Sequence, residues 1–243
     1  MRLAVADGPD IVCLQELPVW GIRRLAGWTG MTVVGDVAQR PRLGPFPSTA
    51  EIGRLVTDLN HALLRSAFTG QANAVLLSPR LRVLDHRDVA LNAYSYRRAQ
   101  ARRLRLGLVN RLAWGKERKT CQALRVQRDE GTFILANMHV TGSTDKRIPD
   151  AELLRAAVFV DGMARPDEPV VLAGDFNLSL RNSKTLPALL HDEWGFTGAT
   201  EIGIDHVLVR GLDAGKPKRW PREQRAWNGR VLADHAPVDR EIA

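Results

Sequence analysis

The sequence is poor in cysteine and has no long apolar run. Its two cysteines, Cys13 and Cys121, lie in apolar, strand-like segments and neither belongs to a C-x-x-C pattern. This excludes a disulfide framework and argues against a zinc site. No apolar run reaches about 18 residues, so we expect no membrane span. The first residues lack the apolar core of a signal peptide, and we therefore expect a cytoplasmic protein.

Acidic residues are also scarce relative to basic ones. There are 35 Lys and Arg residues, 29 of them Arg, against 27 Asp and Glu residues, and the formal net charge is +8. A basic surface is typical of proteins that bind polyanions, most often nucleic acid. A compositional arginine bias with solvated side chains would give the same count. Charge alone leaves both interpretations open.

Short apolar runs alternate with amphipathic segments along the chain, without an internal repeat or a clear linker. Many strands and few helices predict a single α+β domain, residues 1–243, built on sheets. A Pro-rich loop is expected at 36–49, and 92–119 is ambiguous, partly a basic loop. Strands are expected at 10–15, 31–36, 73–78, 81–86, 120–126, 131–140, 169–174, 204–211 and 235–242, and helices at 19–28, 50–67 and 149–163.

Acidic, amide and imidazole side chains stand at the ends of five predicted strands. Burying such a group without a partner is costly. One polar strand end is typical of a turn or a cap, whereas five of them indicate one polar site where the strands emerge. The five segments are Gln15-Glu16, Asn137-Met138-His139, Gly174-Asp175-Phe176-Asn177, Asp205-His206 and Asp234-His235.

Asp175 and Asn177 form the most informative pair. Their i, i+2 spacing points both side chains to the same side of an extended chain. A carboxylate can bind a hard cation or orient water, and an amide can donate to a phosphate oxygen without adding repulsive charge. These are the requirements of phosphoryl transfer with a divalent metal.

The five segments contain the motifs LQE, NMH, GDFN, IDH and DHAPV. In this order they resemble the endonuclease/exonuclease/phosphatase superfamily, from about residue 3 to the C-terminus. That superfamily includes pancreatic-type deoxyribonucleases, exonuclease III, inositol-polyphosphate phosphatases, neutral sphingomyelinases and deadenylases. The resemblance implies a four-layer α/β/β/α sandwich of two mixed sheets flanked by helices. It also implies a hydrolase of phosphoric esters that depends on Mg²⁺ or Mn²⁺.

The resemblance further implies which side chains bind the metal and the phosphate. Glu16 would ligate the metal, and Asp234 would lie near that metal or a second one. Asp175 would orient the attacking water. Asn177 would hold the scissile phosphate.

Two histidines receive roles from the same resemblance. His235 would act as a general acid or base, or stabilise the phosphorane-like charge, with Asp205 fixing its tautomer. His139 would contact the phosphate or assist the leaving group. His206 is adjacent to Asp205, so on a strand it points to the opposite face and is expected to lie outside the site.

One feature departs from the superfamily pattern. The superfamily usually begins with a strand that ends in an Asn, which helps to ligate the metal. Here Met1 is followed almost at once by the helix-like RLAVADGPD. Either the chain is truncated or the site is completed differently, and both alternatives bear on metal affinity and on catalysis.

Two basic segments that also contain aromatic residues predict a nucleic-acid-binding surface. The segment 216–230 leads to Asp234-His235 and should form the rim of the site, whereas 94–119 could also be a solvated loop. Basic side chains would bind phosphates, and aromatic rings would stack on bases or wedge into a groove. The assigned residues are Arg97, Arg98, Arg102, Arg103, Arg219, Trp220, Arg222, Arg225 and Trp227.

A nuclease that acts on DNA or RNA is therefore the leading hypothesis. A phosphatase or phospholipid phosphodiesterase, of inositol phosphate or sphingomyelin type, would use the same residues. No exposed apolar loop for lipid docking is evident in the sequence, which argues against this alternative. A third class is a metal-binding, non-catalytic relative that binds nucleic acid. The missing Asn favours it, and the five polar motifs argue against it.

Overall fold

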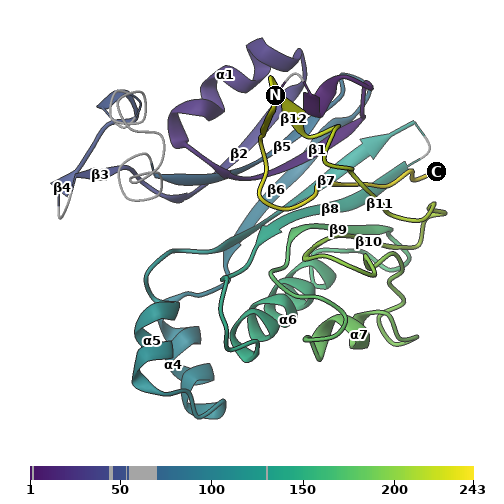
Figure 1. The fold of residues 1–243 in the computed structure, drawn as a ribbon. Coiled ribbons are helices and arrows are strands. Elements are labelled where there is room, and N and C mark those ends of the chain that lie inside the picture. Colours follow the sequence, from purple (N-terminus) through teal and green to yellow (C-terminus); the bar gives the residue numbers. More distant parts are fainter. Residues whose placement is uncertain (2, 44–45, 53, 55–69, 130) are drawn as a thin grey trace. The chain divides into compact units, whose positions relative to one another are not determined.

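The computed structural model describes residues 1, 3–43, 46–52, 54, 70–129 and 131–243. The chain divides into two compact units, Met1–Arg82 and Val83–Ala243. Each unit contains one main β-sheet with helices beside it (Figure 1). The structure is thus an α+β fold with two main sheets flanked by helices, which confirms the predicted class. The organisation as a single domain stays a prediction.

A three-stranded antiparallel sheet forms the first unit, in the order β1-β5-β2. Its strands are β1 (Ile11–Leu17), β2 (Thr32–Gln39) and β5 (Gln71–Leu77). Helix α1 (Val19–Thr29) contributes Leu25 to a small core with Met31, Ala74 and Leu76. The helix ends at Gly30, whose φ of 70° lets its N–H bond to the carbonyl of Ala26. The strands predicted at 31–36 and 73–78 and the helix predicted at 19–28 are confirmed.

The segment between β2 and β5 differs from its prediction. Residues 36–49 are not simply a loop, because β2 continues to Gln39 and two short strands follow, β3 (Arg42–Leu43) and β4 (Phe46–Pro47). Prolines in this segment supply no N–H donor, which limits the pairing to two residues on each side. The predicted helix 50–67 falls mostly outside the described residues; 50–52 and 54 are helical.

The second unit contains a mixed five-stranded sheet in the order β10-β9-β8-β7-β6. Strands β7 and β8 form the predicted antiparallel hairpin, and β8 runs parallel to β9. Strand β9 therefore lies between β8 and β10, which is antiparallel to it. The bounds are β6 (Arg82–Ala90), β7 (Thr120–Arg128), β8 (Gly131–His139), β9 (Val170–Asp175) and β10 (Asp205–Arg210).

Helix α6 (Arg147–Asp161) makes the crossover between the parallel strands β8 and β9. Its buried face consists of Leu153, Ala156, Ala157 and Val160, which recur at helical spacing and join the main core of the unit. The helix begins two residues before the predicted start at Pro149, because proline is tolerated within a first helical turn. A short helix, α7 (Thr185–Leu189), packs near α6.

The stretch 92–119, which the sequence left ambiguous and partly a basic loop, is largely helical. It contains α4 (Tyr94–Arg103) and α5 (Leu108–Trp114), which lie side by side (Figure 1). The apolar periodicity of α4 is weak, so the sequence pattern did not reveal it. Burial of Trp114 against Ala101, Leu106 and Ile148 stabilises both helices instead.

The C-terminal segment forms short pairs where a loop at 216–230 and a strand at 235–242 were predicted. β11 (Lys218–Arg219) pairs with β14 (Val238–Asp239), and β12 (Ala226–Trp227) pairs with β13 (Arg230–Val231). Asn228 and Gly229, with φ of 48° and 75°, make the tight turn of the second pair. The Arg240 guanidinium donates to the carbonyls of Thr197 and Val207. The predicted last strand is thus paired only at Val238–Asp239.

Substitution of Gly174 tests how closely the backbone of β9 approaches that of β8. Its φ is 138°, and an added Cβ would lie 1.9 Å from the Met138 carbonyl oxygen. Gly131 has almost the same φ, 136°, but no described atom lies within 4 Å of an added Cβ. We expect Gly131→Ala to cost about 1–3 kcal/mol of backbone strain, and Gly174→Ala to cost about 2 kcal/mol more. Urea unfolding of both variants measures the difference, and equal costs would contradict the close approach.

Candidate active site

Three neighbouring strands bring their polar ends to one edge of the five-stranded sheet. Asp175 is the last residue of β9, and Asp205 is the first residue of β10. The two pair directly across the antiparallel ladder. On the other side of β9, His139 at the end of β8 is in register with Asp175. The sheet thus assembles the side chains of three predicted segments at one place.

Asp175 is buried and is held by the residue two positions further along the chain. Its Oδ1 accepts the backbone N–H of Asn177 at 2.8 Å, and its Oδ2 accepts from Asn177 Nδ2 at 3.2 Å. Asn177 has a left-handed φ of 48°, so the chain turns after β9 instead of staying extended. The i, i+2 pair therefore meets through a turn. The same Nδ2 also donates to the Val140 carbonyl at 3.1 Å.

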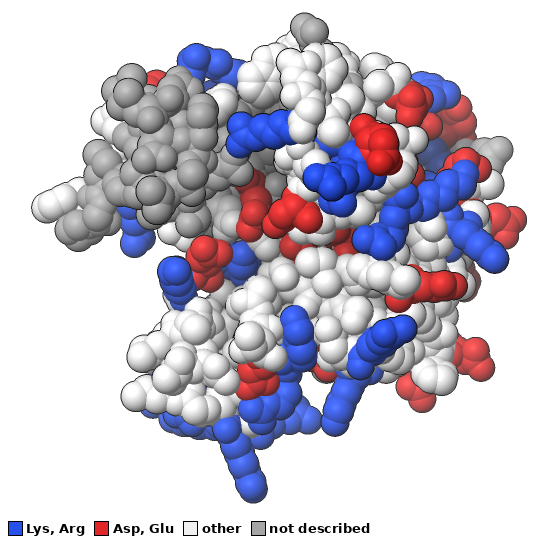
Figure 2. All heavy atoms as spheres, in the orientation of Figure 1, with Lys and Arg blue, Asp and Glu red and all other residues white. Residues whose placement is uncertain are grey.

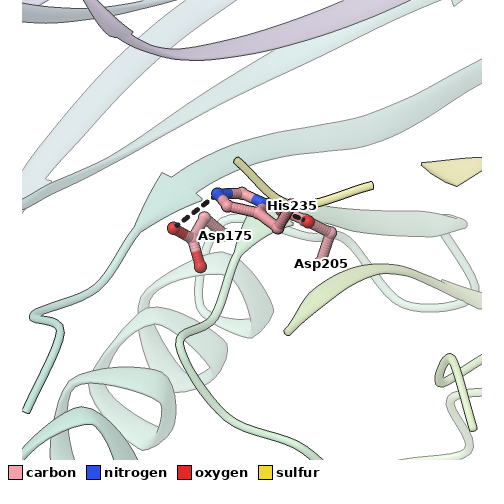
Figure 3. Close-up of side chains that lie close together, drawn as sticks. All are labelled: Asp175, Asp205 and His235. Atoms are coloured by element: carbon pink, nitrogen blue, oxygen red, sulfur yellow. Dashed lines mark hydrogen bonds and ion pairs between the residues drawn. The ribbon is translucent and has the colours of Figure 1, made fainter. Parts of the chain in front are cut away.

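His235 lies between the two aspartates (Figure 3). Its Nδ1 donates a short hydrogen bond to Asp205 Oδ2, and its Nε2 lies 3.8 Å from Asp175 Oδ2. The hydrogen bond to Asp205 raises the pKa of His235 to about 9, and the charges of Asp205, Asp175 and Asp234 add to this effect against the cost of burial. The imidazole is therefore protonated at neutral pH.

Asp234 stands apart from this arrangement. Its side chain is 93% exposed, and its Oδ1 accepts the backbone N–H of His235 at 3.1 Å. The same oxygen lies 3.5 Å from His235 Nε2. Ligand atoms of Asp175, Asp205 and His235 all lie within 4.8 Å of one another. Two carboxylates in such a group fit a hard cation such as Mg²⁺ or Mn²⁺, which prefers oxygen ligands.

His139 has the opposite electrostatic environment from His235. It is buried, and its Nε2 lies 3.2 Å from Lys119 Nζ and 3.7 Å from Asp175 Oδ2. Burial, followed by the charges of Lys119 and His235, lowers the pKa of His139 to about 3. The ring is therefore neutral, and its Nε2 accepts from the ammonium group. For the same reason the approach to Asp175 is not an ion pair.

Lys119 is a site residue whose position the sequence did not reveal. It was counted in the basic segment 94–119, but it is buried directly before β7 and also pairs with Glu117 Oε2 at 3.1 Å. One signal in the sequence could have found it. Lys119 directly precedes the alternating strand 120–126, which the predicted hairpin pairs with the strand that carries NMH.

His206 has a structural role in the sheet. Its Nδ1 accepts the backbone N–H of Thr200 at 3.0 Å, and its Nε2 donates to the Leu178 carbonyl at 2.9 Å. Burial lowers its pKa, which keeps the ring neutral. Both ring nitrogens are thus used to join the segments that flank β10.

Glu16 belongs to the first unit, where it lies in an irregular part of β1. The pairing of β1 with β5 shifts register between Leu14 and Leu17, and Glu16 has a left-handed φ of 55°. Its Oε1 accepts from Gln71 Nε2 at 3.3 Å. A bulge with a positive φ at a non-glycine residue is costly and is often found at functional sites. Its role as a metal ligand stays a prediction.

Comparison with known families identifies this arrangement of motifs. The family model described as the endonuclease/exonuclease/phosphatase family matches residues 1–225. The chain belongs to the endonuclease/exonuclease/phosphatase family. The match ends before His235, and it is the tertiary structure that places this residue against Asp205. No curated protein sequence matches the chain.

Solved structures of this family share the fold at low sequence identity. The human Nocturnin catalytic domain with bound sulfate is 15% identical with a TM-score of 0.65, covering 98% of this chain and 83% of that one. A truncated Caenorhabditis elegans TDP2 is 14% identical with a TM-score of 0.60, covering 98% and 86%. The Bacteroides thetaiotaomicron mannosyl-6-phosphatase is 14% identical with a TM-score of 0.60, covering 100% and 88%.

The arginines predicted to bind nucleic acid in this family member occupy two separate places. On α4, Arg98, Arg102 and Arg103 are exposed. Arg97 is partly buried and stacks over the Tyr94 ring at 6.0 Å. This part of the basic segment is thus a helix with three exposed arginine side chains.

The second predicted surface lies in the C-terminal segment. Arg219, Arg222 and Trp227 are exposed there, with Trp227 beside the turn of the β12–β13 pair. Trp220 and Arg225 are partly buried and hold the segment together: the Trp220 indole donates to Asp239 at 2.5 Å, and Arg225 donates to the Ala233 carbonyl at 3.2 Å. In this segment, contact with nucleic acid is therefore expected chiefly from Arg219, Arg222 and Trp227.

Removal of the Lys119 ammonium tests the environment of His139. We expect Lys119→Met to raise the pKa of His139 from about 3, because one of the two charges that oppose protonation is lost. Burial remains, so the pKa should stay below 6.5. NMR titration of the ring protons measures it, with Lys184→Met, at an exposed site, as the control. An unchanged His139 titration in Lys119→Met would rule out this pairing.

Proposed function

We propose that the chain is a divalent-metal-dependent phosphodiester hydrolase that acts on DNA or RNA. The observation that carries this proposal is the Asp175 carboxylate, fixed by Asn177 and flanked by a neutral His139 and a protonated His235. Membership of the family supports phosphoester hydrolysis. The exposed Arg219 and Arg222 in the C-terminal segment support a nucleic-acid substrate.

Asp175 would orient the attacking water. Each of its oxygens accepts an N–H of Asn177, so the orientation of the carboxylate is fixed before substrate binds. Asp175 and Asp205 would hold a divalent cation, which, when bound, neutralises phosphoryl charge and acidifies water. Glu16 stays a predicted ligand of the metal.

His235 and Lys119 would stabilise negative charge on the phosphate from two directions. His235 is protonated and is held by Asp205, so its Nε2–H can donate to a phosphoryl or leaving oxygen. His139 is neutral and accepts from Lys119, so we assign it a positioning role instead of the contact with the phosphate or the leaving group that the resemblance implied. Fixed positive groups in a buried site stabilise the transition state without reorganisation.

Cleavage assays on plasmid and on labelled DNA and RNA oligonucleotides test the proposal. We expect cleavage with Mg²⁺ or Mn²⁺ and none with chelator, and a fall of about 10²–10⁴-fold in Asp175→Asn and His235→Asn. Asp192→Asn and His191→Asn are matched controls at exposed positions and should keep the wild-type rate. A wild-type protein that cleaves none of these substrates, or active-site variants as fast as the controls, would show that the proposal is wrong.

The raised pKa of His235 predicts the alkaline limit of this activity. Because protonated His235 is present below its pKa of about 9, the rate should hold through neutral pH and fall as the pH rises through about 9. Asp205→Asn removes the interaction that raises the pKa, so the fall should move toward 6.5. Profiles of kcat/KM against pH for both proteins, with Asp192→Asn as control, measure this shift. An alkaline limit that does not move in Asp205→Asn contradicts the role of His235.

A phosphatase or a phospholipid phosphodiesterase is the second candidate function. One observation supports it: α5 exposes Leu108, Val109 and Leu112, an apolar surface that the sequence did not reveal. A fold neighbour is also a phosphatase of a phosphorylated sugar. Parallel assays on oligonucleotides, inositol phosphates, mannose 6-phosphate and sphingomyelin vesicles separate the candidates. Metal binding in calorimetry without turnover on any of them would favour a non-catalytic relative.

A further inference from the structure

Helices α4 and α5 form a hairpin, residues 94–114, that is strongly basic. The sequence from 92 to 116 contains no Asp or Glu. In the same stretch it contains seven basic residues, namely Arg97, Arg98, Arg102, Arg103, Arg105, Arg111 and Lys116. All but Arg97 are exposed. The hairpin therefore carries a positive charge that no acidic side chain of its own sequence offsets.

The same hairpin exposes an aliphatic face. On α5, Leu108, Val109 and Leu112 are 72%, 79% and 68% exposed, and their spacing places them on one side of the helix. Single exposed apolar residues are ordinary, but three together on a helix of seven residues form a patch that calls for a partner. In Figure 2 the surface over α4 and α5 is largely white, with Lys and Arg gathered along its lower edge.

The hairpin is anchored on its inner side, so this exposure is built into the fold. Trp114 is buried, and its indole donates to the buried Glu152 of α6 at 2.5 Å. The Tyr96 hydroxyl donates to the Ala151 carbonyl at 2.6 Å. α5 therefore turns its aromatic residue to the core and its aliphatic residues to solvent.

We propose that the α4–α5 hairpin docks on an anionic lipid surface. Aliphatic side chains can enter the boundary between headgroups and acyl chains, while arginines around them pair with anionic headgroups. Both the aliphatic side chains and the arginines of the hairpin would then contact the lipid. A nucleic acid would use the arginines and could stack a base on the exposed Tyr94, but it would leave the three aliphatic side chains of α5 in water. Two copies of the hairpin would repel each other.

Vesicle co-sedimentation of the full chain tests this docking. We expect binding to mixed phosphatidylcholine and phosphatidylglycerol vesicles, weak binding to phosphatidylcholine alone, and a loss of binding as salt is raised. Arg102→Gln with Arg103→Gln should weaken binding roughly thirtyfold, because each arginine near the surface contributes about fivefold. Leu108→Ser with Leu112→Ser should weaken it about tenfold or more. Circular dichroism of each variant verifies the fold.

Matched variants elsewhere in the second unit complete the design. Arg165→Gln with Arg181→Gln removes the same charge, and Ile202→Ser removes an aliphatic side chain that is equally exposed; both should bind vesicles like wild type. The Leu108→Ser, Leu112→Ser protein should also keep its affinity for a labelled oligonucleotide in fluorescence anisotropy. This inference does not rest on the proposed nuclease activity.

Three outcomes would overturn the inference. The first is wild-type protein that does not sediment with anionic vesicles, or hairpin variants that sediment as well as the controls. The second is loss of oligonucleotide affinity in both hairpin variants without any vesicle binding, which would assign the surface to nucleic acid. The third is a dimer in light scattering that the aliphatic variant dissociates, which would assign it to a second copy of the chain.

Discussion

The charge of Asp175 is the constraint on which the second unit's polar edge depends. A carboxylate buried at the end of a central strand is costly unless it is partnered. The turn after β9 supplies two N–H donors from Asn177, and the C-terminal segment supplies the imidazolium of His235. The neighbouring strands β8 and β10 supply His139 and Asp205 through their register. Each partner comes from a different segment, so the arrangement forms only with the sheet.

Two histidines near one carboxylate reach opposite protonation states for identifiable reasons. His235 is half-buried and donates to Asp205, which stabilises its charged form. His139 is buried beside the Lys119 ammonium, which stabilises its neutral form. Positive charge therefore lies on both sides of Asp175, on Lys119 and on His235.

Two surface elements of the second unit carry the exposed arginines described above. The C-terminal segment, which carries His235, is tied to β10 by Arg240 and closed by the β11–β14 pair. The α4–α5 hairpin is anchored by Trp114 and exposes charge and aliphatic area together.

The sequence by itself determined most of the long strands, their polar ends and the family, because period-two alternation and the order of the motifs are local properties of the chain. It therefore pointed to Asp175, Asp205 and His235 before their contacts were known. Only the tertiary structure decided that Lys119 is buried beside His139, that Asn177 meets Asp175 through a turn, and that 94–114 is a helical hairpin. Burial of Lys119 depends on the pairing of β7 with β8, and α4 and α5 depend on Trp114 packing against Ile148. Such contacts join residues far apart in sequence, and local pattern does not encode them.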